Sequence, residues 1–578
     1  MSKFNKLNPM LLTDFYKTIH HLAYVPKLEY LVSYWTPRMS RIEGIDKVVM
    51  FGLQALIKEY LIDAFNDNFF NRPWEEVEAE YKRIIENTMS VQAGDTTEMK
   101  KLHELGFLPI EIKAVEEGTR VNIKTPMFEI RNTAPNHEFG WLVNYLETYI
   151  SVNIWHPMTA ATIGYEYRKI ANKYYNMTVD NAPVSGAIGD FSMRGMTSIP
   201  TAIRSSSGHL LSFTGSATIG AIPWLEEFYN CDCTKEVVGK GVPSLEHSVV
   251  TSYGREGEFE CYRHILEDVF PKGPISVVSD SYDYFNVLTN FLPRLKDIIM
   301  KRDGTTIIRG DSGNICDIIC GTLRANRDYI TVDGLTEDKI EEYFKNEAEN
   351  TYPWNGTYES YYNVRIDDYL YRITCYHEWT DGDDEDEEGY YTDTVDEVNW
   401  TKEEITPEMK GTVELLWDTF GGTVNSKGYK VLDPHIRMIY GDGVTIALAP
   451  EIYDGLAKKG FAANNCTLGA GSFSYQFHTR DTFSFALKCT NSIVFGEERQ
   501  IFKDPKTDKV KGNNFKKSQK GMCIIYRDED DILYTDGHTI EEADNAENNL
   551  LKPVFKDGKL LTNYSLKEIR DRLHNGKF

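Results

Sequence analysis

The sequence lacks several features that would narrow its interpretation at once. It has no CxxC pair, and its nine cysteines are scattered over 578 residues, which argues against a zinc site and against a disulfide framework. It has no run of about 18 uninterrupted apolar residues and no long apolar segment near its start, so neither a membrane-spanning helix nor a secretory signal is predicted. We therefore expect a cytoplasmic protein without a membrane partner.

Positive charge is also scarce. The chain has 63 Lys and Arg against 88 Asp and Glu, for a formal net charge of -25. A surface of this sign repels nucleic-acid backbones, so nucleic acid is not an expected partner. The length exceeds what one hydrophobic core supports, and the composition is that of an ordinary globular protein. We expect at least two folded domains.

From about residue 184 the sequence repeats one pattern: a short apolar run ends in a cluster of Gly, Ser, Asp or Arg, and a helix-compatible stretch follows. The pattern occurs in "APVSGAIGDFSMRG", "HLLSFTGSAT", "VPSLEHS", "PISVVSDSYD", "TTIIRGDSGN", "IRMIYGDGV" and "NCTLGAGSFS". Buried strands that alternate with helices predict βαβ units. Repetition at roughly 30-residue spacing predicts an irregular, TIM-like α/β barrel with its polar loops at one face.

The remaining segments predict the domain organisation. We assign residues 151–484 to the barrel-like domain and residues 1–150 and 485–578 to a second, smaller α+β domain formed from both chain ends. The stretch "VFKDGKLL" predicts a hairpin around Asp557 and Gly558. Residues at about 325–410 are read as an insertion, in which alternating Tyr, Val and Ile predict antiparallel strands. Its acidic run "DGDDEDEEGYY" is usually a solvated loop and less often a partner or cation site.

Loops at the predicted strand ends carry the candidate chemistry. In "IIRGDSGN" backbone N–H groups can approach an anion while Arg309 neutralises it, and "YGDGV" and "LGAGSFS" are further glycine-bearing loops. Three such loops at one face favour a phosphate-bearing ligand. Asp280 is either a helix N-cap or a group that holds a ribose hydroxyl or, through water, magnesium.

Two further features stay open on local pattern alone. Residues 502–521 contain seven lysines, which form either a solvated loop or, with Arg480 and Lys488 upstream, a cation cluster for a pyrophosphate group. His247 in "VPSLEHSVV" is either a packed histidine or a chemical group. Glu246 does not decide between them, because adjacent residues of a strand point to opposite faces.

At these residues the sequence resembles the nicotinamide phosphoribosyltransferases, within the type II phosphoribosyltransferase family, over nearly its whole length outside the insertion. The resemblance rests on "LLTDFYKTIH", "FGLQALIKEYL", "LPIEIKAVEEG", "GDFSMRG", "VPSLEHS", "SVVSDSYD", "IIRGDSGN", "NSKGYKVL", "IYGDGV", "TRD", "VFGEERQIFKDP" and "VFKDGKLLTNYSLKEIR". It implies a magnesium-dependent enzyme that joins nicotinamide to 5-phosphoribosyl 1-pyrophosphate, giving nicotinamide mononucleotide and pyrophosphate in NAD salvage. It also implies a homodimer with active sites at the interface.

The resemblance assigns roles position by position. It implies catalytic roles for His247, Asp280 and Asp311, with His247 as the histidine that ATP phosphorylates. It implies substrate or product contacts for Asp14, Tyr16, Phe191, Arg194, Ala217, Arg309, Gly310, Asp311, Gly441, Asp442, Gly471, Ser472 and Arg480. It implies diphosphate contacts for Arg38, Arg194, His247, Arg309, Lys488 and Lys503. Phe191 is the expected ring-stacking aromatic, and Asp14 and Tyr16 are expected to reach in from the second subunit.

The sequence departs from the family pattern at four of its motifs. Ala217 stands where the family has the Asp that accepts a hydrogen bond from the nicotinamide amide, so nicotinic acid stays an alternative substrate. Gly310, Ser472 and Ala486 replace the usual Pro, Gly and Ser. A second alternative is a binding or signalling homologue that has lost turnover and docks through its acidic insertion. Retention of Asp280, Arg309, Asp311, Arg480 and His247 argues against that alternative.

Overall fold

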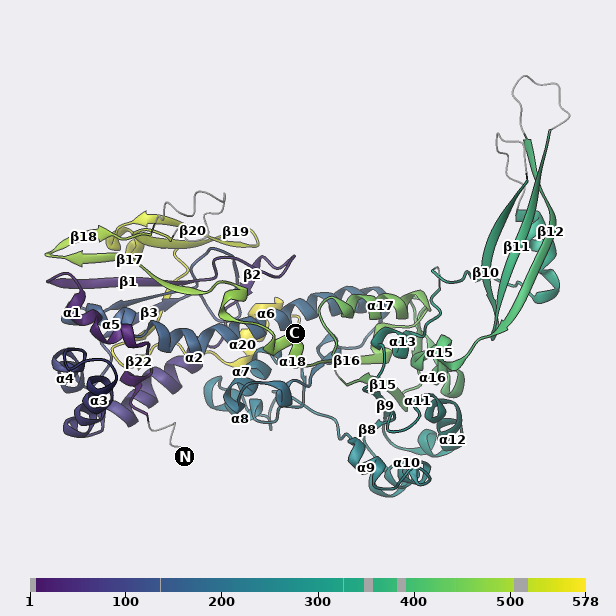
Figure 1. Ribbon diagram of the computed structural model, residues 1–578, viewed down its shortest axis with the longest axis horizontal. Helices are drawn as coiled ribbons and strands as arrows, with labels where there is room; N and C mark the ends of the chain where they lie inside the picture. The colour runs from purple at the N-terminus through teal and green to yellow at the C-terminus, as the bar shows by residue number, and fades with distance from the viewer. Residues whose placement is uncertain are drawn as a thin grey trace. The chain divides into compact units, whose positions relative to one another are not determined.

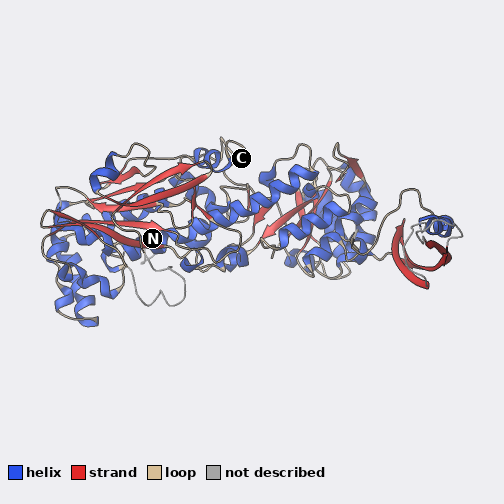
Figure 2. Ribbon diagram, turned by 90° about the horizontal axis from the view of Figure 1, so that it is seen from above, coloured by secondary structure: helices blue, strands red, loops and turns tan. Residues whose placement is uncertain are grey.

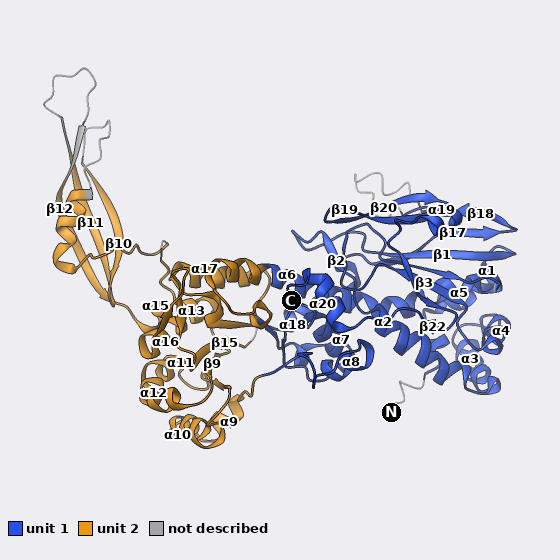
Figure 3. Ribbon diagram, turned by 180° about the vertical axis from the view of Figure 1, so that it is seen from behind, with its two compact units in different colours: residues 1–169, 188–241, 470–578 blue, residues 170–187, 242–469 orange. Residues whose placement is uncertain are grey.

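The computed structural model describes residues 7–135, 137–325, 327–347, 357–381, 391–441, 443–503 and 518–578. The chain forms two compact units (Figure 3). Unit 1 contains residues 1–169, 188–241 and 470–578, and unit 2 contains residues 170–187 and 242–469. These boundaries differ from the domain boundaries expected near residues 150 and 485, which stay a prediction.

Unit 1 is organised around an antiparallel sheet with strands from both chain ends (Figure 1). The strand order is β18 (Glu497–Gln500), β17 (Ala486–Val494), β1 (Leu28–Thr36), β5 (Phe128–Asn132), β3 (Ile110–Ala114), β21 (Lys552–Lys556) and β22 (Lys559–Leu560). In the middle of this sheet Trp35 stacks on Phe128 and on Phe485, with ring centroids 5.8 and 5.3 Å apart. Large buried aromatics of this kind dominate the energetics of a core.

Unit 1 also contains shorter strands and several α-helices. Its short strands pair as β2 (Lys47–Val49) with β4 (Arg120–Asn122), β6 (Ile188–Asp190) with β7 (Gly215–Ser216), and β19 (Met522–Asp528) with β20 (Asp531–His538). Its α-helices are α1 (His20–Ala23), α2 (Leu53–Leu56), α3 (Trp74–Thr88), α4 (Thr97–Leu105), α5 (Gly140–Tyr145), α7 (Ile199–His209), α8 (Ala221–Phe228), α18 (Ser472–Gln476), α19 (Ile540–Asn545) and α20 (Leu566–His574). The long helix α6 (Glu147–Thr178) has residues in both units.

The predicted hairpin at the C-terminal end is confirmed. Strands β21 and β22 pair with Lys556 opposite Lys559. Asp557 and Gly558 between them have φ values of 47° and 76°. A two-residue hairpin turn that matches the right-handed twist of its strands requires positive φ at both central positions. The dipeptide Asp-Gly adopts this conformation at little energetic cost.

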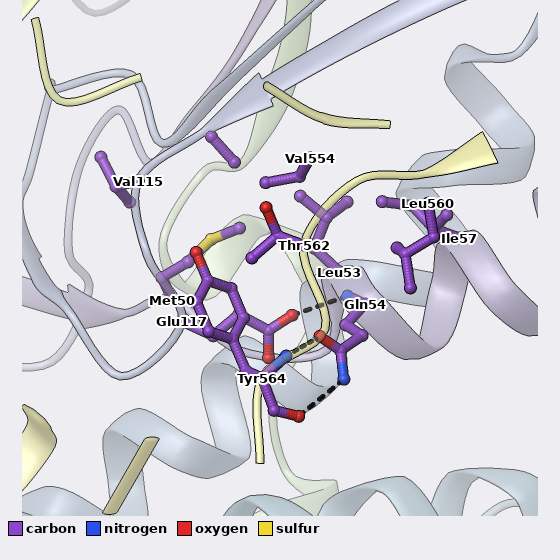
Figure 4. A pocket seen from close by; sticks show the side chains of 11 residues that line it. Met50, Leu53, Gln54, Ile57, Val115, Glu117, Val554, Leu560, Thr562 and Tyr564 are labelled. Carbon is purple, nitrogen blue, oxygen red and sulfur yellow. Dashed lines mark hydrogen bonds between the residues drawn. The ribbon is translucent and has the colours of Figure 1, made fainter. Parts of the chain in front are cut away.

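A small pocket in unit 1 contains a buried carboxyl group (Figure 4). Glu117 accepts hydrogen bonds from the backbone N–H groups of Gly52 and Gln54, at 3.1 and 2.6 Å, where α2 begins. The Gln54 side chain in turn bonds the backbone N–H and C=O of Tyr564. Burial raises the pKa of Glu117 from 4.5 to about 7, because a low-dielectric interior disfavours the charged form.

Unit 2 contains four strands of a six-stranded sheet, in which β6 and β7 are the other two. Its strands lie in the order β16 (Cys466–Ala470), β15 (Ile436–Tyr440), β9 (Thr306–Gly310) and β8 (Ile275–Val278), and they curl as half of a barrel (Figures 1 and 2). Each adjacent pair is parallel. The intervening helices are α9 (His247–Thr251), α10 (Glu258–His264), α11 (Tyr284–Asn286), α12 (Leu292–Lys301), α13 (Ile315–Cys320), α15 (Pro407–Lys410), α16 (Thr412–Phe420) and α17 (Leu448–Lys458). A short antiparallel pair, β13 (Gly422–Val424) and β14 (Lys430–Leu432), completes the set.

The repeated sequence pattern predicted these strands well. Six of its seven segments contain a strand, namely β6, β7, β8, β9, β15 and β16. The segment "VPSLEHS" instead forms only an isolated bridge between Ser244 and Ser276. Its single Leu between Ser and Glu offers too short an apolar run to extend that bridge.

The insertion forms a sheet of its own within unit 2. Strands β10 (Thr357–Ile366), β11 (Tyr369–Asp381) and β12 (Tyr391–Glu404) pair antiparallel (Figure 1). One face packs on α14 (Ile340–Glu347), with Phe344, Val364 and Ile373 in a separate core. The antiparallel strands predicted here are therefore confirmed. The centre of the acidic run, residues 382–390, lies outside the described residues.

The predicted fold class is confirmed. The chain combines a curled parallel α/β sheet with an antiparallel part built from both chain ends. No helix among the described residues has the length and apolar character needed to cross a membrane.

Candidate active site

Three parallel strands of unit 2 end side by side and carry the candidate catalytic residues. Val278 of β8 is opposite Arg309 of β9, and Gly310 of β9 is opposite Tyr440 of β15. The residues that follow each strand therefore meet at the carboxyl edge of the sheet, where ligands bind in open α/β sheets. Asp280, Asp311 and Gly441 occupy these positions.

The two aspartates are connected through backbone and side chain. Oδ2 of Asp280 accepts a hydrogen bond from the backbone N–H of Asp311, at 3.1 Å. Oδ2 of Asp311 pairs with Nη2 of Arg309, at 3.0 Å. The side chain of Asp280 is only 5% exposed, so its orientation is set by the protein rather than by solvent. One guanidinium and two carboxylates therefore lie together at the carboxyl edge of the sheet.

Gly441 makes room for Asp311. A Cβ atom at position 441 would lie 2.0 Å from Oδ1 of Asp311 and 3.3 Å from Cδ of Arg309. The Gly441 N–H also donates to the carbonyl of Gly310, at 3.2 Å. A larger residue at this strand end would displace the carboxylate of Asp311 from its observed position. Asp442, the next predicted site residue, lies outside the described residues.

His247 faces the same carboxylates from the first residue of α9. Its Nε2 lies 3.7 Å from Oδ1 of Asp280 and 3.9 Å from Oδ2 of Asp311. Its Nδ1 lies 3.0 Å from Oγ of Ser281, and its side chain is 45% exposed. A packed histidine would be buried and fully bonded, so the packed-histidine alternative is wrong. Nε2 instead presents an accessible ring nitrogen beside two acids.

Two carboxylate oxygens at this edge accept no hydrogen bond from the residues that the structure describes. Oδ1 of Asp280 and Oδ1 of Asp311 are buried and have no hydrogen-bond partner among the residues that the structure describes, and Nε of Arg309 is in the same situation. Buried polar atoms are normally paired, so these three atoms are free to bond a bound ligand or water. In the described part of the chain no three His, Cys, Asp or Glu side chains cluster as a metal site.

Unit 1 gathers a second set of predicted residues around β6, β7 and α18. The N–H of Phe191 donates to the carbonyl of Ala470, at 2.9 Å, just before Gly471. The N–H of Ala217 donates to the carbonyl of Asp190, at 2.8 Å. The helix α18 begins at Ser472, whose Oγ would lie 2.1 Å from a Cβ at Gly195, the neighbour of Arg194. Phe191, Arg194, Ala217, Gly471 and Ser472 thus belong to one local arrangement.

A third set lies near β17 in unit 1. The N–H and side-chain Nε of Arg38 donate to the carbonyls of Phe483 and Ser484, both at 3.0 Å. Burial, with Arg480 nearby, lowers the pKa of the Arg38 guanidinium. Lys488 pairs with Glu147 at 3.2 Å.

Two predicted residues of the N-terminal segment adjoin this third set. Asp14 accepts a hydrogen bond from Oγ1 of Thr148, at 2.6 Å. The exposed Tyr16 has its pKa raised by partial burial, with Glu147, Asp14 and Arg480 close enough to influence it. Lys503 is exposed, and most of the lysine-rich run, residues 504–517, lies outside the described residues.

Comparison with known proteins decides the family. The sequence model described as the nicotinate phosphoribosyltransferase (NAPRTase) family matches residues 187–352 and 393–559. The chain belongs to this family. It is 34% identical to a protein of Acinetobacter baylyi named nicotinamide phosphoribosyltransferase, over 98% of this chain and 97% of that protein. A protein of the same name from Xanthomonas campestris pv. campestris is 27% identical over 97% of each chain.

Further relatives agree with this family assignment. A Mycoplasma pneumoniae protein, also named nicotinamide phosphoribosyltransferase, is 30% identical over 72% of this chain and 71% of its own. The crystal structure of nicotinate-nucleotide pyrophosphorylase from Pyrococcus furiosus has a similar fold, with a TM-score of 0.52 and 12% identity over 100% of this chain and 96% of that one. At that identity the likeness concerns the fold alone.

Two contributors to the site were not among the predicted residues. Ser281 bonds His247, and Asp190 accepts hydrogen bonds from the Ser192 N–H at 3.0 Å and the Ser216 hydroxyl at 3.3 Å. Both stand directly beside predicted residues, in "SDSYD" and "GDFSMRG". Both could have been predicted by treating every polar residue of a strand-end loop as a candidate, because neighbouring residues of such a loop contact the same site.

Proposed function

We propose that the chain transfers the phosphoribosyl group of 5-phosphoribosyl 1-pyrophosphate to the pyridine nitrogen of nicotinamide, giving nicotinamide mononucleotide and pyrophosphate in NAD salvage. The observation that carries this proposal is the 34% identity, over 98% of the chain, with a protein named nicotinamide phosphoribosyltransferase. The cluster of His247, Asp280, Arg309 and Asp311 at one strand edge supports it, because phosphoribosyl transfer needs both cations and carboxylates there.

The strand-edge residues have complementary roles in this reaction. As the bond between C1 and the pyrophosphate oxygen breaks, positive charge develops on the ribose ring and negative charge on the leaving group. The buried Oδ1 atoms of Asp280 and Asp311 can accept hydrogen bonds from ribose hydroxyls, and Arg309 can neutralise a phosphate oxygen. Groups held in place before the reaction stabilise developing charge without reorganisation.

The donor set also fits magnesium bound through the substrate. Carboxylate oxygens with spare acceptor capacity bind water molecules of a hydrated magnesium ion, which usually keeps several waters. Asp280 and Asp311 are the residues that would hold it. A magnesium ion carried with the pyrophosphate would neutralise the charge of the leaving group.

His247 is the proposed link to ATP. Its Nδ1 is engaged by Ser281, which leaves Nε2 as the accessible nitrogen beside Asp280 and Asp311. Transfer of the terminal phosphoryl group of ATP to Nε2, with ADP as the leaving group, would add negative charge at the strand edge beside Asp280 and Asp311. We propose that this change couples ATP hydrolysis to the affinity for substrate.

The remaining predicted residues have proposed binding roles. In unit 1, we propose that Phe191 stacks on the pyridine ring, that Gly471 and Ser472 contact the 5′-phosphate, and that Arg194, Arg38, Arg480, Lys488 and Lys503 bind phosphate groups. In unit 2, we propose that Gly441 and Asp442 contact a 5′-phosphate. We further propose a cytoplasmic homodimer in which Asp14 and Tyr16 reach the second subunit's site. The exposed Phe473 and Phe477, stacked with centroids 4.7 Å apart, support an apolar contact surface.

Nicotinic acid is the second candidate substrate, and one observation favours it. Position 217 is an exposed alanine, so it provides no carboxylate to accept a hydrogen bond from the amide of nicotinamide. A site that pairs with a substrate N–H rejects analogues that lack it, and loss of that group weakens the rejection. The relatives named for nicotinamide outweigh this single position.

The proposal is tested by supplying the purified chain with 5-phosphoribosyl 1-pyrophosphate, magnesium and nicotinamide. Release of pyrophosphate together with nicotinamide mononucleotide is the expected result. If no pyrophosphate were released with either nicotinamide or nicotinic acid, with or without ATP, the proposed enzymatic activity would be refuted. The alternative of a binding or signalling homologue would then stand.

A further inference from the structure

A buried histidine joins two substrate-binding segments of unit 1. His209 is the last residue of α7 and is completely buried. Its Nε2 lies 3.1 Å from the carbonyl oxygen of Gly215 in β7, and its Nδ1 lies 2.6 Å from the hydroxyl of Tyr475 in α18. The ring therefore bridges the strand that precedes Ala217 and the helix that begins at Ser472.

The two bonds determine the form of the ring. The carbonyl of Gly215 can only accept, so Nε2 carries the hydrogen and donates it. Burial lowers the pKa of His209, which leaves the ring neutral and makes Nδ1 an acceptor for the Tyr475 hydroxyl. One neutral imidazole thus donates on one side and accepts on the other.

Asp190 also bonds the end of β7. It is fully buried, and its carboxylate accepts from the N–H of Ser192 and the hydroxyl of Ser216. The Ser216 hydroxyl also lies 2.7 Å from the hydroxyl of Ser206 in α7 and accepts from the N–H of Thr218, at 2.9 Å. Because Asp190, Ser206 and Thr218 are buried and all three are bonded to the partly buried Ser216, the segment from Gly215 to Thr218 has little freedom to shift independently of α7.

We propose that His209 is a positioning residue that holds the pyridine-binding segment at the end of β7, which carries Ala217, at a set separation from the 5′-phosphate-binding segment (Gly471 and Ser472). The inference rests on the proposed function and deepens it. The pyridine nitrogen must approach C1 of the ribose, whose 5′-phosphate is held at the other segment. The separation of the two segments therefore sets the distance between the reacting atoms.

This role predicts a kinetic effect of a particular kind. Each segment keeps its own ligand contacts when the bridge is broken, so the binding of each substrate changes little. The reacting atoms, however, lose their alignment, and a misplacement of about 1 Å can cost about 100-fold in rate. The loss therefore falls on kcat, with little change in either KM.

Tyr475→Phe removes the hydroxyl that bonds Nδ1 of His209, and Tyr167→Phe is its matched control. Tyr167 is also buried, and its hydroxyl lies 2.6 Å from Oγ of Ser474 in the same helix α18. That hydrogen bond does not extend to β7. Both variants delete one buried hydroxyl beside α18, and melting temperatures of both report any general loss of stability.

Initial rates over a matrix of nicotinamide and 5-phosphoribosyl 1-pyrophosphate concentrations yield kcat and both KM values. For Tyr475→Phe we expect kcat to fall by about 10- to 100-fold with each KM within about threefold of wild type, and for Tyr167→Phe we expect kcat within about threefold. Equal effects of the two variants at matched melting temperatures would overturn the inference. So would a loss confined to KM.

A second variant tests whether His209 acts through this bond. His209→Asn removes the imidazole, and the double variant His209→Asn with Tyr475→Phe should lose no more activity than the more impaired single variant, because both break one bridge. Additive losses would show that the two residues act separately. Turnover by the wild-type chain reports on the proposed function itself, so failure of the bridge is seen in the variants while wild-type activity persists.

Discussion

Oδ2 of Asp280 accepts a hydrogen bond from the backbone N–H of Asp311, at 3.1 Å. The side chain at one strand end thereby holds the backbone of the next, and Oδ1 of each aspartate stays available for a ligand, with no partner among the described residues. The position of each carboxylate therefore depends on the other loop. The strand edge therefore behaves as one unit rather than as two independent acids.

Asp311→Asn is expected to lower kcat/KM by about 100-fold. The change keeps the size of the side chain but removes the charge that pairs with Arg309 and that would face the developing positive charge on the ribose. Asp317→Asn is the control, because Asp317 also pairs with an arginine, Arg324, at 2.9 Å and lies on α13. Initial rates of pyrophosphate release measure both, and similar losses in the two variants would contradict the assigned role.

Gly441→Ala tests the packing of the same edge. The added Cβ would meet Oδ1 of Asp311 at 2.0 Å, so the carboxylate must move, and overpacking of this kind costs about 1–3 kcal/mol. We expect at least about a tenfold loss of kcat/KM. Gly186→Ala has no atom within 4 Å of its Cβ and should leave activity unchanged. An active Gly441→Ala enzyme would show that Asp311 need not occupy its observed position.

His247→Ala is expected to abolish stimulation by ATP while some basal transfer persists, because the accessible Nε2 is lost and Asp280 and Asp311 stay. His264→Ala is a close control: His264 is likewise 45% exposed and faces a carboxylate, Asp268, at 2.9 Å. Rates with and without ATP separate the two variants. Full ATP stimulation of His247→Ala would remove this histidine from the coupling step.

Glu117→Gln is expected to remove a pH dependence of stability. With its pKa raised from 4.5 to about 7, the folded carboxyl keeps a proton that the unfolded chain releases between these pH values. The free energy of unfolding of the wild type therefore falls as pH rises through this window, by up to about 3 kcal/mol, and levels off above pH 7.

Melting temperatures between pH 4.5 and 8 test the Glu117 prediction. The difference between Glu117→Gln and wild type should grow in favour of the variant up to about pH 7. Glu116→Gln, at the neighbouring and 54% exposed side chain, controls for the loss of one carboxylate. Parallel pH profiles for Glu117→Gln and wild type would disprove the burial argument.

The sequence predicted much of the parallel sheet because buried parallel strands leave a plain signal. Apolar runs that end in Gly, Asp or Arg marked β8, β9 and β15, and with them Asp280, Arg309, Asp311 and Gly441. The hairpin at Asp557 and Gly558 was also predictable from the sequence, because Asp-Gly is one of the few dipeptides that accept positive φ at both positions.

Other features depended on long-range contacts that local pattern does not contain. Local pattern left the role of His247 open, and only the family resemblance gave it a catalytic role; its approach to Asp280 and Asp311, which follow strands β8 and β9, becomes visible in the structure. The bridge from His209 to Tyr475 spans 266 positions of sequence. Neither residue lies in a motif that points to the other, so the pairing becomes visible only in three dimensions.

The most direct test of the central claim compares two pyridines in one assay. Purified chain, 5-phosphoribosyl 1-pyrophosphate and magnesium are combined with nicotinamide or nicotinic acid, and initial rates of mononucleotide and pyrophosphate formation are measured in parallel. We predict that kcat/KM for nicotinamide exceeds that for nicotinic acid by at least about tenfold. A preference for the acid would make the chain a nicotinate-using enzyme and contradict the proposed substrate.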